Sequence, residues 1–552
     1  MIAAFFLRII GIQYALPFRI SLDESSLVYG TLKMMELHTL IPSLHSDIFN
    51  NLLSYPPYIP YIYIPFFLFG AVIKFLQFLF MGGGVTDAET FKLLLASDPS
   101  IFFVIARAIS ALFGLATVYA VYKISKNIFK NEKLALFSAA FLAFSFLHVS
   151  FSHAARHWIY VTLFFSLVMY ALSRFDYSVQ KRYTMAFVLL GLGMGVNYQV
   201  GIGVFFITLW FLCFERLSIV EHFQKAWAYK ALGLYFILSI FAIALFPHTT
   251  GLMDQTLGRD WGLLGLLKTY NFYMSQMWSV EFIFLLFVAI GLIVSFFRNR
   301  GYFWISSGFP LIYIAFFYFV YHTHDNGRYL LMLYPVFAIT AGYGFYYFHE
   351  KLLLLMPKLF VYGLTFSIFF FMLFVSLKLD YLLAKADTRV QASEWINAEL
   401  PADARLITFA PFMKLPATSE ALQEQGSIDP SSVSRIDIAG SLVPQKFSAF
   451  PKHYSVNLYG IKNIAVISDI KNYIKMNDFD YLIYAEDLVL LENKGLMELL
   501  DVKGENIKVI KGFSGTDGDI NNDFVGGLKY ILNSDNNGPT MIIKKISKTV
   551  IN

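Results

Sequence analysis

The first 384 residues consist largely of apolar stretches that are about as long as a membrane is thick. A bilayer core of about 30 Å requires roughly 20 apolar residues per helix. Stretches of this kind lie near residues 103–122, 134–150, 158–173, 231–247, 280–297, 302–321, 329–348 and 359–377. Only 15% of the 552 residues are charged and 57% are hydrophobic, whereas a soluble domain carries about a quarter charged residues. The chain is therefore a polytopic α-helical membrane protein.

The density of charge changes near Leu383. Residues 1–384 hold 25 basic and 17 acidic residues, and residues 385–552 hold 18 and 21. We expect a transmembrane domain at 1–384 and a soluble α/β domain at 385–552, because spaced apolar runs follow a helix-like segment there. The expected helix is Thr388–Leu400, the expected strands are Leu406–Phe409, Ile464–Ile467, Tyr481–Ala485 and Met541–Ile543, and Gly504–Gly518 and Asn533–Gly538 are expected to be turns.

Composition also excludes several classes of protein. The single cysteine, Cys213, excludes a disulfide framework and any Cys-ligated metal cluster. The net charge of +5 is small for this length, so we expect no nucleic-acid partner.

Three segments decide the membrane topology. Met1–Leu16 lacks the basic flank of a signal peptide and is expected to be the first span. Thr184–Phe214 has basic residues on both sides, so an even number of crossings is expected, which predicts a hairpin of two short helices. Tyr58–Phe80 contains two prolines and Lys74, which suit a helix lying on the membrane surface.

With Tyr58–Phe80 outside the bilayer, 14 Lys and Arg residues fall in the inner loops. The positive-inside rule then predicts about eleven spans with a cytoplasmic N-terminus. Phe18 to about Phe102 becomes a long outer loop that lies partly on the membrane, and the soluble domain is extracytoplasmic.

The outer loop opens with the adjacent carboxylates Asp23 and Glu24. Carboxylates at the membrane surface are costly and tend to be functional. Alternatively, Asp23 caps a helix over Ser25–Leu37 and Glu24 lies in its first turn. The two roles are compatible.

Further motifs follow these carboxylates in a characteristic order. They are Leu7-Arg8-Ile9-Ile10-Gly11 before the pair, and then Tyr55-Pro56-Pro57, Ala106–Gly114, Ser152-His153-Ala154-Ala155-Arg156, Gly191–Gly195 and Gly327–Pro335. This order resembles the membrane glycosyltransferases with the GT-C fold, specifically the protein O-mannosyltransferase and aminoarabinose transferase superfamily. The resemblance covers roughly residues 3–350, and the order of the motifs carries it.

The resemblance implies a glycosyltransferase that moves a sugar from a polyprenyl-phosphate donor to an acceptor on the outer face, with inversion at the anomeric carbon. It also implies juxtamembrane helices in the first outer loop. The acceptor is a lipid, a glycan or a protein, and the style of the sequence suggests a prokaryotic plasma membrane.

The same resemblance assigns roles to single residues. Asp23 would be the base that takes the proton of the acceptor hydroxyl, and Glu24 would orient the acceptor or Asp23, or help to hold a divalent ion. Arg156 and Arg328 lie at outer ends of spans, so they suit the negative charge of the leaving lipid phosphate. Their alternative role is to anchor the helices at lipid headgroups. His153 and Tyr55 are weaker candidates for substrate binding.

Arg107 matches a family position, but inside a span it could equally pair with a buried carboxylate, so it is left out of the predicted site. Many related enzymes carry an Asp where His157 and Trp158 stand, which puts a second acidic or metal ligand in doubt.

The sequence singles out no certain cofactor, and a divalent cation stays an open alternative. His322-Thr323-His324-Asp325 offers metal ligands, although such a pair also occurs by chance in loops. The outer loop His248–Ser279 is either a cover over the substrates or a passive connector.

Two other functions compete with this one. A GT-C enzyme that uses polyprenyl-diphosphate oligosaccharides would differ only in its donor. A non-enzymatic lipid or solute transporter would favour ionisable residues in the middle of its spans. The predicted spans are nearly free of charge at their centres, which argues against a transporter.

Overall fold

The structure is a computed structural model. It describes residues 1–18, 22–49, 52–53, 56–81, 87–215, 226–246, 262–321, 327–410, 412–413, 415–444, 451–459, 473–474, 476–486, 502–512 and 527–547. Tyr55, His322–Asp325, residues 248–261 of the expected loop His248–Ser279 and the expected strand Ile464–Ile467 lie outside these residues. From Leu263 onward the expectation of a loop is wrong, because these residues are helical.

The chain forms two compact units. The first comprises Met1–Ile12, Asp23–Pro65 and Ala106–Asp380, and the second comprises Gln13–Leu22, Phe66–Ile105 and Tyr381–Asn552. The second unit therefore takes up two segments from the N-terminal part of the chain in addition to its C-terminal part.

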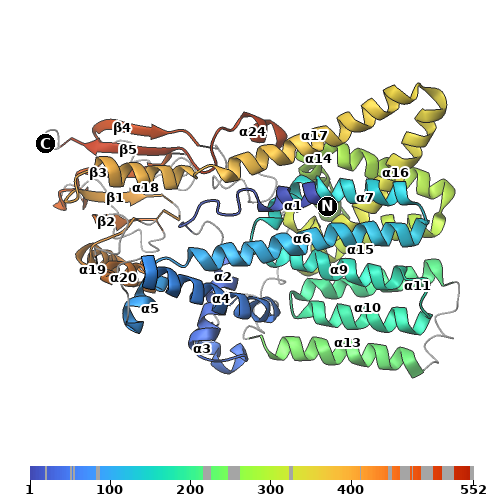
Figure 1. Cartoon of the computed structure of the whole chain (residues 1–552), viewed down its shortest axis with the longest axis horizontal. Helices are drawn as coiled ribbons and strands as arrows, with labels where there is room; N and C mark the ends of the chain where they lie inside the picture. Colours follow the sequence, from blue (N-terminus) through green and yellow to red (C-terminus); the bar gives the residue numbers. More distant parts are fainter. Residues whose placement is uncertain are drawn as a thin grey trace. The chain divides into compact units, whose positions relative to one another are not determined.

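The first unit is helical (Figure 1). Its helices are α1 (Ile2–Ile9), α2 (Leu22–Glu36), η1 (Pro42–His45), α3 (Ser46–Phe49), α7 (Glu132–Ala143), α8 (Phe146–Ser152), α9 (His157–Ser173), α10 (Val179–Met194), η2 (Tyr198–Ile202), α11 (Gly203–Phe214), α13 (Ala226–Ala244), α14 (Leu263–Arg298), α15 (Arg300–Phe316), η3 (Phe317–Tyr321), η4 (Gly327–Leu333) and α16 (Tyr334–Leu355). α2 has its first residue, Leu22, in the second unit, and three further helices have residues in both units: α4 (Tyr58–Met81), α6 (Ser100–Phe129) and α17 (Lys358–Ala384).

Multi-pass membrane character is confirmed, but the number of long apolar helices is lower than the eleven spans expected. Among the described residues, seven helices are long and apolar enough to cross a membrane, or eight if the bent pair α7 and α8 is one span. One of the seven is α4, the segment expected to lie on the surface. The helices α9 and η2–α11 are apolar but shorter.

The N-terminal segment differs from the expectation of a first span. α1 ends at Ile9, and eight helical residues extend only about 12 Å. Gly11 adopts a φ of 81°, a backbone conformation that glycine tolerates and that ends the helix.

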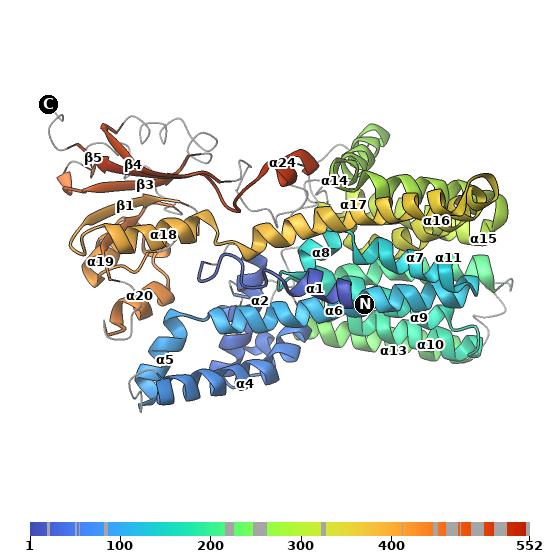
Figure 2. The ribbon, with the colours of Figure 1, turned by 45° about the horizontal axis from the view of Figure 1, so that its top comes forward.

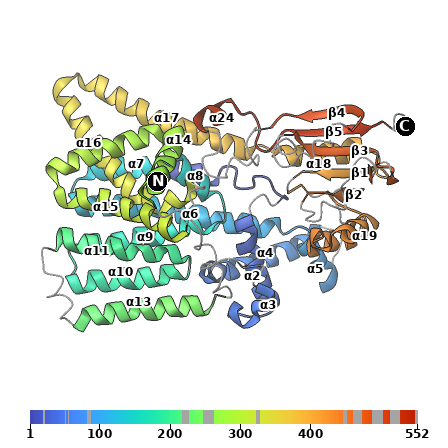
Figure 3. The same cartoon turned by 180° about the vertical axis from the view of Figure 1, so that it is seen from behind.

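The predicted hairpin between Thr184 and Phe214 is confirmed as two helices, α10 and α11, separated at Gly195–Asn197. α9, α10 and α13 lie side by side (Figure 3). A Cβ at Gly195 would come within 2.2 Å of the Tyr58 ring, and the Tyr58 N–H donates to the Gly195 carbonyl at 3.1 Å. The turn between α10 and η2 therefore packs directly on the start of α4.

The second unit contains the expected soluble α/β domain. Its elements are α5 (Ala88–Ser97), α18 (Thr388–Glu399), β1 (Arg405–Phe409), α19 (Ser419–Ile428), η5 (Pro430–Ser432), α20 (Arg435–Leu442), β2 (Tyr454–Asn457), β3 (Tyr481–Ala485), β4 (Gly504–Ile510), α24 (Gly527–Asn533) and β5 (Met541–Ile546). The sheet has the order β2-β1-β3-β5-β4 (Figure 2). β2, β1 and β3 are parallel, and β5 runs antiparallel to both β3 and β4.

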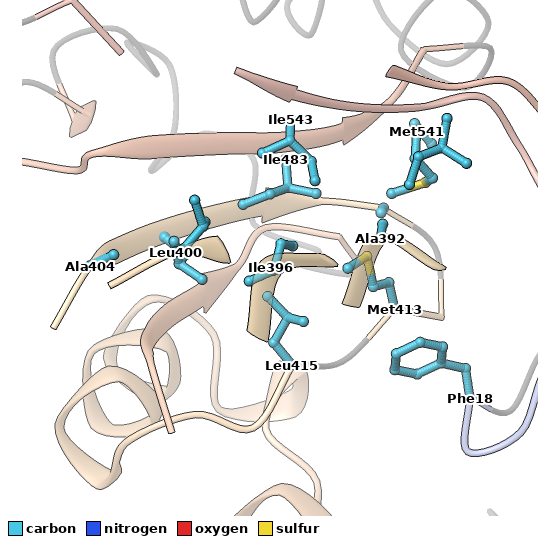
Figure 4. Packing of buried hydrophobic residues seen from close by; sticks show 14 residues of the cluster. Phe18, Ala392, Ile396, Leu400, Ala404, Met413, Leu415, Ile483, Met541 and Ile543 are labelled. Carbon is cyan, nitrogen blue, oxygen red and sulfur yellow. The ribbon is translucent and has the colours of Figure 1, made fainter. Parts of the chain in front are cut away.

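Helices cover both faces of this sheet, because successive strand residues point to opposite sides. Ile483 packs with Ala392 and Ile396 of α18 on one face (Figure 4). Its neighbour Leu482 packs with Ala421 of α19 on the other. Phe18 joins the α18 face from the N-terminal segment of this unit.

The sequence located β1, β3, β5 and α18 but not the other two strands. Gly504–Gly518 was expected to be a turn, and this is wrong for Gly504–Ile510, which forms β4. The first three residues of β4 are exposed, so this outer strand lacks the apolar pattern of a buried one. β2 has the sequence Tyr-Ser-Val-Asn, so it lacks the continuous apolar run by which β1, β3 and β5 were located.

Candidate functional site

Asp23 and Glu24 lie in the first turn of α2, not at its cap. The expected helix over Ser25–Leu37 is thus confirmed with an earlier start, and Asp23 does not cap it. Negative side chains in a first turn interact favourably with the helix dipole. Successive helical residues point about 100° apart, so the two carboxylates enter different surroundings.

Glu24 is fully buried and pairs with Arg107 of α6. The Arg107 Nε and Nη2 atoms donate to the two carboxylate oxygens of Glu24, each at 2.8 Å. The backbone N–H of Ala155 donates to Glu24 Oε1 at 2.7 Å, and Arg107 Nη1 donates to the Ile12 carbonyl at 3.0 Å. This two-point ion pair joins α2, α6 and the segment between α8 and α9.

Asp23 lies beside Arg328 of η4. The distance from Arg328 Nη1 to Asp23 Oδ2 is 3.8 Å, and the two side chains are 20% and 23% exposed, respectively. Partial exposure leaves room for a substrate group next to the Asp23 carboxylate, in contrast with its neighbour Glu24.

Two aromatic rings hold the Arg328 guanidinium. Its central carbon lies 5.8 Å from the centroids of both the Trp158 and the Tyr329 rings. These rings meet edge to face at 5.1 Å and 82°. A cation over aromatic faces is stabilised electrostatically, so η4 and α9 together fix the position of this charge.

Arg156 directly precedes α9 and is almost completely buried. Its guanidinium lies 5.5 Å from the centroid of Phe151. The next residue, His157, interacts electrostatically with Asp23, Arg156 and Arg328. Three of the predicted residues therefore contribute to the electrostatic environment of His157.

His153 is placed elsewhere. Its Nδ1 atom lies 3.0 Å from the Val149 carbonyl and its Nε2 atom 2.8 Å from the Ile10 carbonyl. Asp380 Oδ1 lies 3.6 Å from Nε2. The contacts of this imidazole are thus with backbone and with the end of α17, and it is fully buried.

A metal centre receives no support from the part of the chain that the structure describes. There, no group of three or more His, Cys, Asp or Glu side chains is arranged to hold a metal ion. Glu24, the carboxylate considered for a divalent ion, has both oxygens bound by Arg107.

Sequence reasoning missed His157, Trp158 and Tyr329 as members of this cluster. Each directly follows a predicted arginine or its neighbour in the sequence. The signal was therefore present, but an aromatic residue in an apolar span looks the same whether it faces lipid or a cation.

The cluster combines a partly exposed carboxylate with two nearby cations in largely buried surroundings. A carboxylate of this kind can accept a proton from a hydroxyl group. Guanidinium groups can bind phosphate oxygens with charge-assisted hydrogen bonds.

Comparisons with known proteins agree with the motif order. Residues 100–246 match the model of the dolichyl-phosphate-mannose-protein mannosyltransferase family. This match confirms the resemblance to the mannosyltransferase superfamily in the region that contains Arg107, Arg156 and the hairpin. No curated protein sequence matches the chain.

The structure is also similar to two solved structures. One is ArnT from Cupriavidus metallidurans bound to undecaprenyl phosphate, with 10% identity over 98% of this chain and 96% of that chain and a TM-score of 0.44. The other is the archaeal oligosaccharyltransferase AglB from Archaeoglobus fulgidus in complex with an inhibitory peptide and a dolichol-phosphate, with 11% identity over 88% of this chain and 68% of that chain and a TM-score of 0.43.

Proposed function

We propose that this protein is an inverting glycosyltransferase that moves a sugar from a polyprenyl-phosphate donor to an acceptor hydroxyl on the outer face of the membrane. The observation that carries the proposal is the pairing of Asp23 and Arg328 at 3.8 Å. The ion pair between Glu24 and Arg107 holds the first turn of α2, which also carries Asp23.

In the proposed reaction Asp23 accepts the proton of the acceptor hydroxyl. The hydroxyl oxygen forms a bond to the anomeric carbon, and the bond from that carbon to the phosphate oxygen breaks. The lipid phosphate leaves with the electron pair, and Arg328 and Arg156 stabilise its added negative charge. One displacement inverts the configuration at the anomeric carbon.

Two observations support this donor and this side of the membrane. The matched family is named for transfer from dolichyl-phosphate-mannose to protein. The Lys and Arg residues at the end of α6 (Lys123–Lys133) and before α17 (Lys351 and Lys358) favour the cytoplasm for these helix ends, which would place the start of α6 and residues 385–552 outside. We infer a prokaryotic plasma membrane as the location and a lipid, glycan or protein as the acceptor.

The second candidate is a related enzyme that takes polyprenyl-diphosphate oligosaccharides. The positive charges of Arg328 and Arg156 match the charge of a monophosphate better than that of a diphosphate, which often needs a metal ion as well. Glu24, the acidic neighbour of Asp23, is already paired with Arg107.

A donor assay in lipid nanodiscs tests the proposal. The purified protein is supplied with sugars on monophosphate and on diphosphate carriers, and release of the carrier and the anomeric configuration of the product are measured. We expect turnover of the monophosphate donor with an inverted product. Turnover of the diphosphate donor alone, or a product with retained configuration, would contradict the proposed reaction.

A further inference from the structure

A break interrupts the helical path between α7 and α8. The two helices are bent by 60° at Phe144 and Ser145. Such a break leaves carbonyl groups at the end of one helix and N–H groups at the start of the next without partners. In lipid surroundings each of these groups must be satisfied by other parts of the protein.

Side chains from two other helices satisfy the carbonyl groups at the end of α7. Arg8 of α1 donates to the Ala143 carbonyl at 3.3 Å and to the Leu142 carbonyl at 3.4 Å. Ser376 of α17 donates to the Phe144 carbonyl at 3.1 Å. The positive charge of Arg8 therefore stands at the negative end of the α7 dipole.

Glu281 of α14 satisfies the opposite side of the break. Its Oε1 atom accepts hydrogen bonds from the Ser145 hydroxyl at 2.7 Å and from the Leu147 N–H at 3.4 Å. Its Oε2 atom accepts from the Tyr334 hydroxyl. The negative charge stands at the positive end of α8, which is the favourable arrangement.

Glu281 also marks a break in its own helix. Its φ of −117° and ψ of 36° are not helical, and α14 bends there. The residue is only 5% exposed. Ionisable groups buried in membrane proteins are rare and usually have a function, and the proposed reaction does not use this one.

The segments that Glu281 holds lead to the two arginines of the candidate site. α8 ends at Ser152, four residues before Arg156, and Ala155 in this stretch donates to Glu24. Tyr334 directly follows η4, which carries Arg328. α8 is about 10 Å long, so Glu281 acts from the far end of these segments and does not touch the substrate.

We propose that Glu281 is a positioning residue that holds the break between α7 and α8 and thereby sets the positions of Arg156 and Arg328. This role rests on the proposed function, because it assigns both arginines to the lipid phosphate. The Glu281 carboxylate contacts both the start of α8, which leads to Arg156, and the residue that directly follows η4, which carries Arg328.

The test compares Glu281→Gln with Val288→Ala. Gln keeps the size of the side chain and one oxygen atom, but it loses the charge that complements α8. Val288 is buried on the same helix, about two turns from the break, so its truncation measures a general loss of packing. Both variants are prepared as full chains in nanodiscs, and their melting temperatures are compared with that of the wild type.

Two readouts are measured on each variant. Hydrogen exchange of residues 144–156 reports on the break, and binding of undecaprenyl phosphate reports on the arginines. We expect faster exchange and a rise in Kd of about tenfold to a hundredfold for Glu281→Gln, as follows when charged groups move by on the order of an ångström. Val288→Ala should leave both values near those of the wild type.

Unchanged exchange and a Kd within about twofold of the wild type in Glu281→Gln would overturn the positioning role, as would equal effects in Val288→Ala. A wild-type protein that does not bind undecaprenyl phosphate contradicts the proposed function itself. In that case the exchange measurement still decides whether Glu281 holds the break.

Discussion

Asp23 and Glu24 are adjacent carboxylates with opposite environments. Glu24 is enclosed by Arg107 and the Ala155 N–H, whereas Asp23 keeps a partly exposed oxygen near Arg328. In the proposed reaction, this difference favours Asp23 for the proton transfer and Glu24 for an anchoring role. The sequence identified the pair, and it left open whether Arg107 served a buried carboxylate. It could not reveal that Glu24 is that carboxylate, because the two residues lie 83 positions apart.

The buried ion pair makes a prediction about stability. Glu24→Gln leaves the Arg107 charge buried without an opposite charge, which should cost about 3–5 kcal/mol. The double variant Glu24→Gln/Arg107→Gln removes both charges and should recover part of this loss. Thermal unfolding of the two variants and of Arg107→Gln alone gives the coupling. If the loss of stability in the double variant equals the sum of the losses in the two single variants, Glu24 and Arg107 do not stabilise the fold as a pair.

Arg328 combines charge with stacking, and two substitutions separate these properties. Arg328→Gln removes the charge and should weaken binding of the lipid-phosphate donor about tenfold to a hundredfold, since a hydrogen bond to a charged group contributes about 1.5–3 kcal/mol. Arg328→Lys keeps the charge but loses the planar contact with Trp158 and Tyr329, so its loss should be smaller. Donor KM and kcat are measured for both. An unchanged donor KM in Arg328→Gln would show that this arginine only anchors the helix.

At the scale of elements, the sequence predicted best what periodicity and length control. The hairpin of α10 and α11 followed from basic residues on both of its sides, and β3 and β5 followed from apolar runs. β4 was missed because its outer residues are polar and exposed. The length of α1 was overestimated because an apolar stretch of sequence does not reveal the left-handed conformation of Gly11.

The sheet unit allows a matched test of its core. Ile483 is completely buried between β3 and α18, whereas Ile438 on α20 is 47% exposed. Ile483→Ala should destabilise the unit by about 2–5 kcal/mol because it leaves a cavity. Ile438→Ala should change stability by no more than about 0.5 kcal/mol. Thermal or denaturant unfolding of the full chain measures the stability of both variants. Equal losses of stability would show that Ile483 does not belong to the core of the sheet unit.

His453 gives the sheet unit a dependence on pH. It is completely buried next to β2, and burial lowers the pKa of its imidazole below the usual value. The unfolded chain therefore binds more protons than the folded one below about pH 6.5, so stability should fall as the pH decreases through that value. His453→Gln should reduce this dependence. Melting temperatures between pH 5.5 and 7.5 are the measurement, and an equal slope in the variant would exclude His453 as the cause.

At the scale of the whole molecule, the change in charge density near Leu383 correctly indicated a helical membrane part and a sheet-containing part. It could not show that Phe18 would join the core of the sheet unit, since a phenylalanine between two apolar helices looks like any other membrane residue. The candidate site depends on the same kind of long-range contact. The motifs supplied its arginines and carboxylates, and only the fold shows that Asp23 pairs with Arg328 while His153 contacts backbone carbonyls and Asp380.

Replacement of the Asp23 carboxylate tests whether this residue is the base for sugar transfer. Asp23→Asn keeps the size of the side chain but cannot take the proton. Asp47→Asn is the matched control, because Asp47 is an exposed carboxylate in the same loop. General base catalysis contributes about 10²- to 10⁴-fold. We therefore predict that Asp23→Asn lowers kcat by at least about a hundredfold at unchanged expression and nearly unchanged donor affinity, with Asp47→Asn at the wild-type rate. Normal turnover by Asp23→Asn would show that Asp23 is not the base.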